Sequence, residues 1–187
     1  MGNAGVESNA QDVLSPRALL INGTVGVGKT TVAEAVSNLL AQQRVPNAVI
    51  DVDALRQAWP CPPDDRFNMG LGLRNLTSVT ANYVEAGIAR LILAGVVETL
   101  SDRRAYEAAL GMPLTICRLQ GDLSVICARL IRRHGDDEHA LKWHLNRAPE
   151  LDAILDSTAI SDCSIDAREA TPPEIALELT RAVGWCA

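Results

Sequence analysis

The amino-acid sequence predicts an α/β fold in which a five-stranded parallel sheet is the middle layer of a three-layer sandwich. Short apolar runs typical of buried strands alternate with longer stretches whose apolar residues recur at helical spacing. This alternation is typical of parallel sheets with helical crossovers. A glycine-rich segment containing a lysine separates the first apolar run from the first helical stretch. We therefore expect ligands at the carboxyl ends of the strands.

Proline and glycine positions separate the elements of the first half of the chain. Pro46 and the loop WPCPPDDR at 59–66 interrupt regular structure, because proline lacks the N–H group that helix interiors and central strands need. Gly87 can close a helix as a C-terminal cap. The expected elements are a strand over 18–22, a helix over 29–43, a strand over 48–52, a short helix from about Ala54, a helix over 74–86 and a strand over 89–97.

Capping residues predict the helices of the second half. Ser101 and Asp122 are expected to begin helices, and Pro149 is expected to interrupt one. Thr171 and Glu174 have the spacing of a capping box. The expected elements are a helix over 101–110, a strand over 114–119, a helix over 122–133, a helix from the polar break at 134–138 to 148, a short helix after it, a strand over 160–166 and a last helix from Pro172 to about 183.

Length and charge narrow the class of protein. The 187 residues fit one domain over residues 17–187 after a disordered lead-in over 1–16. A formal net charge of −6 argues against binding to nucleic acids or to a membrane surface. Five cysteines without a C-x-x-C pair, Cys186 among them, and no spanning or signal segment are typical of a cytoplasmic protein. We expect a monomer or a homodimer.

The segment from Gly23 to Thr31 fits the phosphate-binding pattern G-x-x-x-x-G-K-[ST] between a strand and a helix. Glycines allow backbone N–H groups to turn around an anion, and the next helix directs its positive end there. Lys29 is expected to meet the β- and γ-phosphates, and the Thr30 hydroxyl to ligate Mg²⁺. A chance glycine turn is the structural alternative. The residues assigned to nucleotide binding are Gly23, Thr24, Val25, Gly26, Val27, Gly28, Lys29, Thr30 and Thr31.

Two carboxylates and an arginine follow the second predicted strand. Asp53 could accept a proton from a substrate hydroxyl, since kinase chemistry needs a carboxylate that orients the nucleophile. Arg56 could hold the substrate, and Asp51 could hold a water on Mg²⁺. The alternative is that one of these carboxylates caps the helix that starts near Ala54.

The phosphate loop together with this second motif resembles the small P-loop kinases. That group includes adenylylsulfate kinases, gluconate and shikimate kinases, and chloramphenicol phosphotransferase-like resistance enzymes. The pattern Val52-Asp53-Ala54-Leu55 through Pro60 is most similar to the chloramphenicol phosphotransferase-like proteins, whereas D-x-D-x-x-R is closer to adenylylsulfate kinases. The resemblance in element order covers about residues 17–183. It implies a P-loop NTPase fold with a short helical lid, and a role for Asp53 in activating the substrate hydroxyl.

The third predicted strand departs from the pattern of many P-loop proteins. It lacks the aspartate that often helps to hold Mg²⁺ at the strand end. Either Asp51 takes this role, or Glu98 does so through a water molecule. The small pair Ala94 and Gly95 leaves room for a ligand or lets the strand pack closely against a helix.

Three arginines end the helix predicted over 122–133. Arg129, Arg132 and Arg133 lie at i, i+3 and i+4, and in small kinases this arrangement resembles the lid whose arginines reach the transferring phosphate. We assign catalytic roles to Arg129 and Arg133, and Arg147 could serve similarly. The alternative is that these cations complement the helix dipole.

The three histidines follow at intervals of five residues, at His134, His139 and His144. This spacing does not place two ligands on one helix face, so they are interpreted as surface histidines and not as a metal site.

The acceptor pocket is expected beside the WPCPPDDR loop and the helix over 74–86. Asn82 and Tyr83 could instead belong to the helix surface and the core. Trp59, Asn75 and Asn82 flank the pocket, and the residues assigned to acceptor binding are Asp53, Arg56, Arg74, Tyr83 and Glu98.

Taken together, the motifs predict an ATP-dependent phosphotransferase that moves the γ-phosphate to a hydroxyl of a small molecule. A nucleoside or nucleotide, a sugar acid or an antibiotic-like compound would fit as the acceptor, with ATP and Mg²⁺ as the expected cofactors. The alternative function is a nucleotide-dependent switch or binding protein that hydrolyses ATP or GTP slowly. No N-K-x-D-like guanine-recognition stretch is present.

Overall fold

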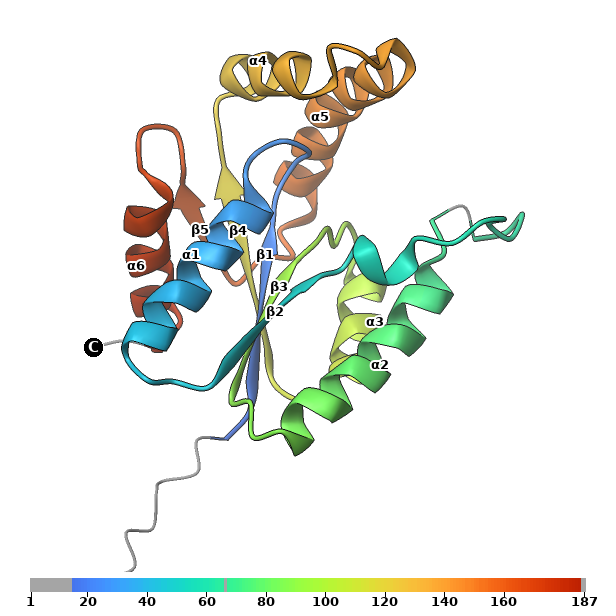
Figure 1. Cartoon of the computed structure of the whole chain (residues 1–187). Helices are drawn as coiled ribbons and strands as arrows, with labels where there is room; N and C mark the ends of the chain where they lie inside the picture. The colour runs from blue at the N-terminus through green and yellow to red at the C-terminus, as the bar shows by residue number, and fades with distance from the viewer. Residues whose placement is uncertain (1–14, 66, 186–187) are drawn as a thin grey trace, which may run out of the picture.

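The computed structural model describes residues 15–65 and 67–185, so Cys186 and most of the predicted lead-in lie outside the described residues. Five parallel strands form one sheet in the order β2-β3-β1-β4-β5 (Figure 1). This arrangement confirms the predicted fold class. The strands are β1 (Arg17–Asn22), β2 (Asn47–Asp51), β3 (Arg90–Ala94), β4 (Leu114–Gln120) and β5 (Cys163–Asp166).

Helices cover both faces of the sheet, and two more stand above its carboxyl edge (Figure 1). Helices α1 and α6 pack together on one face, α2 and α3 cover the other, and α4 with the first half of α5 rises over the loop that follows β1. The helices are α1 (Lys29–Gln42), a short 3₁₀ turn η1 (Ala54–Arg56), α2 (Met69–Glu85), α3 (Leu100–Leu110), α4 (Leu123–His134), α5 (Glu138–Thr158) and α6 (Pro172–Ala182).

The central strand β1 is apolar on both faces. Leu19 and Ile21 belong to the core cluster under α1 and α6, whereas Ala18 and Leu20 belong to the cluster under α2 and α3. Successive side chains of a strand point to opposite faces, so a strand buried between two helical layers must be apolar at every position. This explains why all four residues from Ala18 to Ile21 are apolar.

Strand register brings the loop after β1 to the middle of the carboxyl edge. Ile21 pairs with Ala94 of β3 on one side and with Cys117 of β4 on the other. On β2, Asp51 pairs with the same Ala94. The ends of β2, β3 and β1 are therefore level, and the residues that follow them meet at one edge.

Two helices begin earlier than predicted. Helix α3 is capped by Thr99 and not by Ser101, because Thr99 and Asp102 form a reciprocal capping box with N–H to side-chain distances of 3.1 and 3.0 Å. Helix α2 begins at Met69, five residues before the predicted start, since the Asp65 carboxylate accepts the N–H groups of Met69 and Gly70 at 2.7 and 2.8 Å. Glycines in its first turns weaken the helical signal there.

Pro149 does not interrupt the helix, contrary to prediction, and α5 continues through it to Thr158. A proline inside a helix removes one backbone hydrogen bond. The buried side chains of Ala148, Leu151 and Leu155 pack on the core on both sides of the proline, and this burial outweighs the lost bond. By contrast, the Asp122 cap and the Thr171–Glu174 capping box form as predicted.

No helix in the described part of the chain is both long enough and apolar enough to cross a bilayer.

Asn22, at the end of β1, gives the first testable prediction. Its side chain is fully buried, donates to the Val97 carbonyl at 2.9 Å and accepts the N–H groups of Gly23 and Val97 at 2.9 and 3.3 Å. Asn22→Ala would leave buried backbone groups unpaired, so we expect it to lower the free energy of unfolding by about 2–3 kcal/mol. Urea denaturation with an unchanged m-value measures this loss.

The matched control is Asn82→Ala on the exposed surface of α2, which should change stability by less than about 0.5 kcal/mol. Equal effects of the two substitutions would contradict a structural role for Asn22.

Candidate functional site

The loop after β1 has the backbone conformation of an anion cradle. Gly26 and Gly28 have φ angles of 80° and 109°, which side chains other than glycine rarely allow. A Cβ at Gly26 would lie 3.0 Å from Leu130 of α4, whereas a Cβ at Gly28 would meet nothing within 4 Å. The loop thus passes close beneath α4 and remains open at Gly28, where α1 directs its unpaired N–H groups outward.

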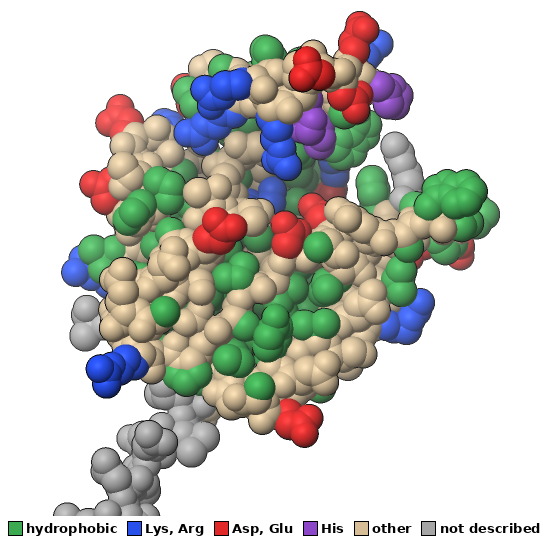
Figure 2. All heavy atoms as spheres, in the orientation of Figure 1, with side chains coloured by type: hydrophobic (Ala, Val, Ile, Leu, Met, Phe, Trp, Pro, Cys, Tyr) green, Lys and Arg blue, Asp and Glu red, His purple; other side chains and the backbone are tan. Residues whose placement is uncertain are grey.

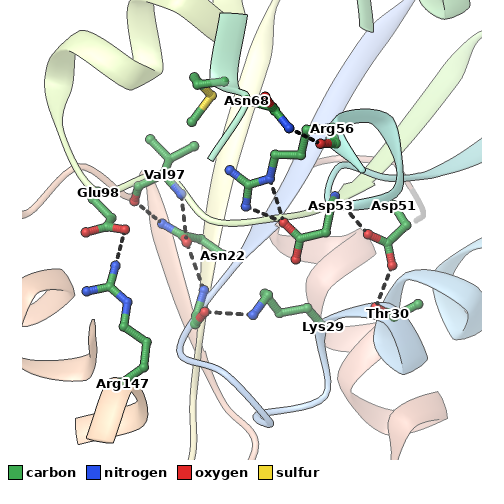
Figure 3. A network of polar contacts seen from close by, with 12 residues as sticks. Asn22, Lys29, Thr30, Asp51, Asp53, Arg56, Asn68, Val97, Glu98 and Arg147 are labelled. Carbon is green, nitrogen blue, oxygen red and sulfur yellow. Dashed lines mark hydrogen bonds and ion pairs between the residues drawn. The ribbon is translucent and has the colours of Figure 1, made fainter. Parts of the chain in front are cut away.

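The ammonium of Lys29 lies inside this loop. Its Nζ donates to the carbonyl oxygens of Gly23 and Thr24, both at 3.0 Å. Figure 3 shows the Lys29 side chain pointing toward the end of β1. Burial lowers the pKa of Lys29 to about 8, and the negative charges of Asp53 and Asp51 act in the opposite direction. A partly buried ammonium with these neighbours gains from any further anion that enters the loop.

A cavity of about 860 Å³ opens around the loop. In Figure 2, cationic and histidine side chains overhang a hollow whose lower rim carries acidic side chains. Its apolar wall is formed by residues between β5 and α6 and by α6 itself. The lining residues outside the loop and α1 are Asp51, Asp53, Ala54, Gln57, Ala94, Arg129, Leu130, Arg132, Arg133, His134, His144, Ala167, Ala170, Pro172 and Ile175.

The two aspartates after β2 have different partners. The Thr30 hydroxyl lies 3.4 Å from Asp51 Oδ2, and Asp51 Oδ1 accepts the N–H of Asp53 at 3.0 Å (Figure 3). The structure therefore brings together the two residues predicted to ligate Mg²⁺. Asp53 occupies the N-cap position of η1, but its carboxylate makes no capping hydrogen bond. It pairs with Arg56 instead, with Nε 3.0 Å from Oδ1.

Arg56 is held in place from three sides. Its stem packs on Gly72 of α2, where a Cβ would lie 3.2 Å away. Its guanidinium pairs with Asp53 and lies 5.9 Å from the ring centroid of Phe67. Asn68 donates to the Arg56 carbonyl at 3.1 Å and so fixes the chain after η1.

Glu98 follows β3 at the same edge and pairs with Arg147 of α5 (Figure 3). Arg147 also pairs with Glu150 at 3.1 Å. Neither Glu98 nor Arg147 lines the cavity around the phosphate loop. The small residue before this segment, Gly95, packs closely, because a Cβ there would lie 3.0 Å from Val52.

Three arginines of α4 line the cavity from above. Arg129, Arg132 and Arg133 have no ion-pair partner among the residues that the structure describes. They therefore leave unneutralised positive charge facing the loop, which suits the binding of phosphate groups.

The interpretation of the histidines as surface residues is wrong for two of the three. His134 and His144 line the cavity and stack on each other, with ring centroids 4.4 Å apart. Burial lowers the pKa of His144, and the neighbouring His134 and Arg133 act in the same direction, while Asp137 opposes them. The turn between α4 and α5 folds the two helices together, which their spacing in the sequence does not reveal. His139 is exposed.

Two residues assigned to acceptor binding lie elsewhere on α2. Tyr83 packs on the core cluster under α2 and α3, and its carbonyl accepts the N–H of Ile88 at 2.9 Å just before β3 begins. It is therefore at the amino end of the sheet, because α2 runs away from the carboxyl edge (Figure 1). Arg74 is exposed and does not line the cavity.

The flanking residues of the predicted pocket have structural positions. Asn75 donates to the Leu55 carbonyl at 2.7 Å and so fastens η1 to α2. Trp59 is 93% exposed on the projecting loop, and Asn82 is exposed on α2.

One contact between the loop and the lid has no sequence signal. The buried Thr24 hydroxyl donates to the Ala148 carbonyl of α5 at 2.6 Å. This carbonyl lies immediately before Pro149, and the bond fastens the phosphate loop to the middle of α5. The partners are 124 positions apart, so only the folded chain shows that they meet.

Comparison with known proteins gives matches among solved structures. No protein-family model matches the chain, and no curated protein does. The tunicamycin resistance protein of Deinococcus radiodurans aligns with a TM-score of 0.64 and 22% identity over 92% of this chain and 97% of that chain. A gluconokinase from Sinorhizobium meliloti 1021 aligns with a TM-score of 0.60 and 20% identity over 90% of this chain and 92% of that one.

The APS kinase of Mycobacterium tuberculosis in complex with AMPPNP and APS aligns with a TM-score of 0.55 and 20% identity over 91% of this chain and 98% of that chain. These likenesses confirm the fold that the sequence motifs predict. The structural neighbours include a gluconokinase, an APS kinase and a shikimate kinase.

The lowered pKa of Lys29 gives a pH prediction. With a pKa of about 8 in the free protein, Lys29 is mostly neutral at about pH 9. Phosphate charges favour the ammonium form, so nucleotide binding at about pH 9 should take up close to one proton, and affinity for Mg-ATP should fall as pH rises above about 8. Calorimetry in two buffers of different ionisation enthalpy measures the uptake.

Lys142, on the exposed surface of α5, is the matched control for this experiment. Lys142→Met should retain the proton uptake, whereas Lys29→Met should abolish it together with tight binding. Nucleotide binding at about pH 9 without proton uptake would contradict the lowered pKa of Lys29.

Proposed function

We propose that the protein is an ATP-dependent phosphotransferase that moves the γ-phosphate to a hydroxyl group of a small molecule. The observation that carries the proposal is that one cavity edge combines a glycine-rich loop with a lysine, a carboxylate, and arginines that have no ion-pair partner in the described part of the chain. Lys29 supplies the cation within the loop, Asp53 lies beside it, and Arg129 and Arg133 face it from the lid. The kinase names of the structural neighbours support the same class of reaction.

The triphosphate would bind along the loop, with its phosphates on the backbone N–H groups and on Lys29. The nucleobase would lie against the apolar wall formed by Ala167, Ala170 and Ile175 at the start of α6. ATP is the proposed donor, and the APS kinase neighbour was solved with AMPPNP.

Thr30 and Asp51 would hold Mg²⁺. Their hydroxyl and carboxylate oxygens lie 3.4 Å apart at the start of α1, and oxygen is the ligand that Mg²⁺ prefers. When bound, the ion would neutralise charge on the β- and γ-phosphates.

Asp53 would accept the proton of the acceptor hydroxyl while the hydroxyl oxygen forms a bond to the γ-phosphorus. The bond from that phosphorus to the bridging oxygen of ADP breaks, and ADP leaves with the charge held by Lys29. Arg56 keeps the Asp53 carboxylate in a fixed orientation. Arg129 and Arg133 would approach the transferring phosphate from the lid, and closure of the lid would exclude water that otherwise hydrolyses ATP.

Substitutions of Lys29 and Asp53 test this proposal. Lys29→Ala should abolish measurable turnover, because the loop loses its cation. Asp53→Asn should keep the Kd for Mg-ATP within about threefold but slow transfer by about 10²–10⁴-fold, the usual contribution of a general base. Transfer is measured by ³¹P NMR or mass spectrometry with a library of hydroxyl compounds, and nucleotide binding by calorimetry.

The matched control is Asp64→Asn in the exposed loop before α2, which should transfer at the parent rate. Transfer by Asp53→Asn at the parent rate would remove Asp53 from the role of base. Slow hydrolysis without transfer to any acceptor, together with a partner protein retained only with ATP, would favour the nucleotide-dependent switch.

A further inference from the structure

The arginines around the proposed site fall into two groups with different partners. Arg129, Arg132 and Arg133 of α4 face the phosphate loop and have no carboxylate partner in the described part of the chain. Those beside the ends of β2 and β3 are both paired with carboxylates: Arg56 with Asp53, and Arg147 with Glu98 and Glu150. This difference bears on the charge of the acceptor.

The paired arginines lie on the side where the acceptor must approach. The apolar wall for the nucleobase is on the side of β5 and α6. In the strand order β2-β3-β1-β4-β5, the ends of β3 and β2 lie on the other side of the phosphate loop from this wall. Figure 3 shows the Asp53–Arg56 pair and the Glu98–Arg147 pair on either side of Lys29 and Asn22. A hydroxyl that reaches the γ-phosphate and Asp53 therefore passes between these pairs.

Arg56 is not available to bind an anion. Its Nε and Nη2 both contact the same oxygen of Asp53, its stem is packed on Gly72, and its side chain is only 18% exposed. An anionic acceptor could recruit it only by displacing Asp53, the group proposed to accept the proton.

Arg147 is held by two carboxylates. Its side chain is 16% exposed, with Glu98 on one nitrogen and Glu150 on the other. If an anionic acceptor displaced Glu98 from Arg147, the partly buried Glu98 carboxylate would lose its partner, which is strongly unfavourable. Arg74 of α2 is exposed and does not line the cavity, and the Asp65 carboxylate near it accepts the N–H groups of Met69 and Gly70.

Among the described residues beside the ends of β2 and β3, Asp53, Glu98 and Glu150 outnumber Arg56 and Arg147, and both of these arginines are already ion-paired. A carboxylate, phosphate or sulfate on the acceptor would meet these carboxylates without a free guanidinium among the described residues named here to balance it. We propose that the acceptor is a neutral or cationic hydroxyl compound, and not a sugar acid or a nucleotide. This inference rests on the proposed phosphotransfer and specifies its substrate class.

Asp53 and Glu98 would then serve as hydrogen-bond acceptors for hydroxyl or ammonium groups of the substrate. Carboxylates accept such bonds strongly, more so where water is excluded.

The test uses the full chain with Mg-ATP and hydroxyl compounds supplied as matched sets. Each scaffold is present as a neutral, an amino-bearing and a carboxylate- or phosphate-bearing form, and phosphoryl transfer is measured by mass spectrometry. We expect every acceptor to be neutral or amino-bearing, with kcat/KM at least about 100-fold lower for its anionic counterpart, the effect of one uncompensated like charge at contact distance.

A double variant tests the residues named. Glu98→Gln with Glu150→Gln frees Arg147, so it should reduce the discrimination against anionic acceptors by at least about tenfold. The matched control is Glu107→Gln, which removes a carboxylate 3.0 Å from Arg103 on α3, where Asp162 still pairs with that arginine. The control should keep the parent discrimination.

A binding measurement needs no turnover. With Mg-AMPPNP saturating the nucleotide site, inorganic sulfate is titrated by calorimetry into the parent and into the double variant. We expect sulfate to bind the double variant at least about tenfold more tightly than the parent. Equal binding to the two proteins would overturn the inference.

The outcomes separate this inference from the proposed function. Preferred transfer to an anionic acceptor would overturn the inference and leave phosphotransfer established. Absence of transfer to every compound would contradict the proposed function, and the sulfate titration would then decide by itself whether this side of the site rejects anions.

Discussion

The partly buried ammonium of Lys29 is the charge on which the whole carboxyl edge depends. Two loop carbonyls accept its hydrogen bonds, and burial holds its pKa near 8 against the attraction of Asp51 and Asp53. An ammonium removed from water in this way needs anions close by. The aspartates after β2 supply part of that charge, and the open face of the loop at Gly28 leaves room for more. Phosphate binding would complete this balance.

The sheet keeps that charge in place. Because β1 lies between β3 and β4 and is apolar on both faces, its end cannot shift without unpacking both core clusters. Asn22 then joins the end of β1 to the segment after β3 through its bonds to Val97. The phosphate loop and Glu98 are consequently positioned by the same buried side chain, which links the proposed nucleotide and acceptor sides.

The second half of α5 belongs to the same rigid frame. Thr24 bonds to the Ala148 carbonyl, and Arg118 of β4 pairs with Asp152 and Asp156 at 2.8 and 2.6 Å. Pro149 lies within this anchored stretch and is tolerated there. Helix α4, which precedes this stretch, presents the three arginines that have no ion-pair partner among the described residues. A lid anchored at its base can carry cations toward a phosphate without disturbing the loop beneath it.

The sequence by itself determined the phosphate loop, the aspartates after β2 and the helix caps at Asp122 and Thr171. Each of these follows from residues that are neighbours along the chain. Only the tertiary structure decided that Tyr83 lies away from the site, that His134 and His144 stack over the cavity, and that Arg147 pairs with Glu98 across 49 positions. These outcomes depend on which distant elements pack together, and long-range packing leaves no periodic signal in a single sequence.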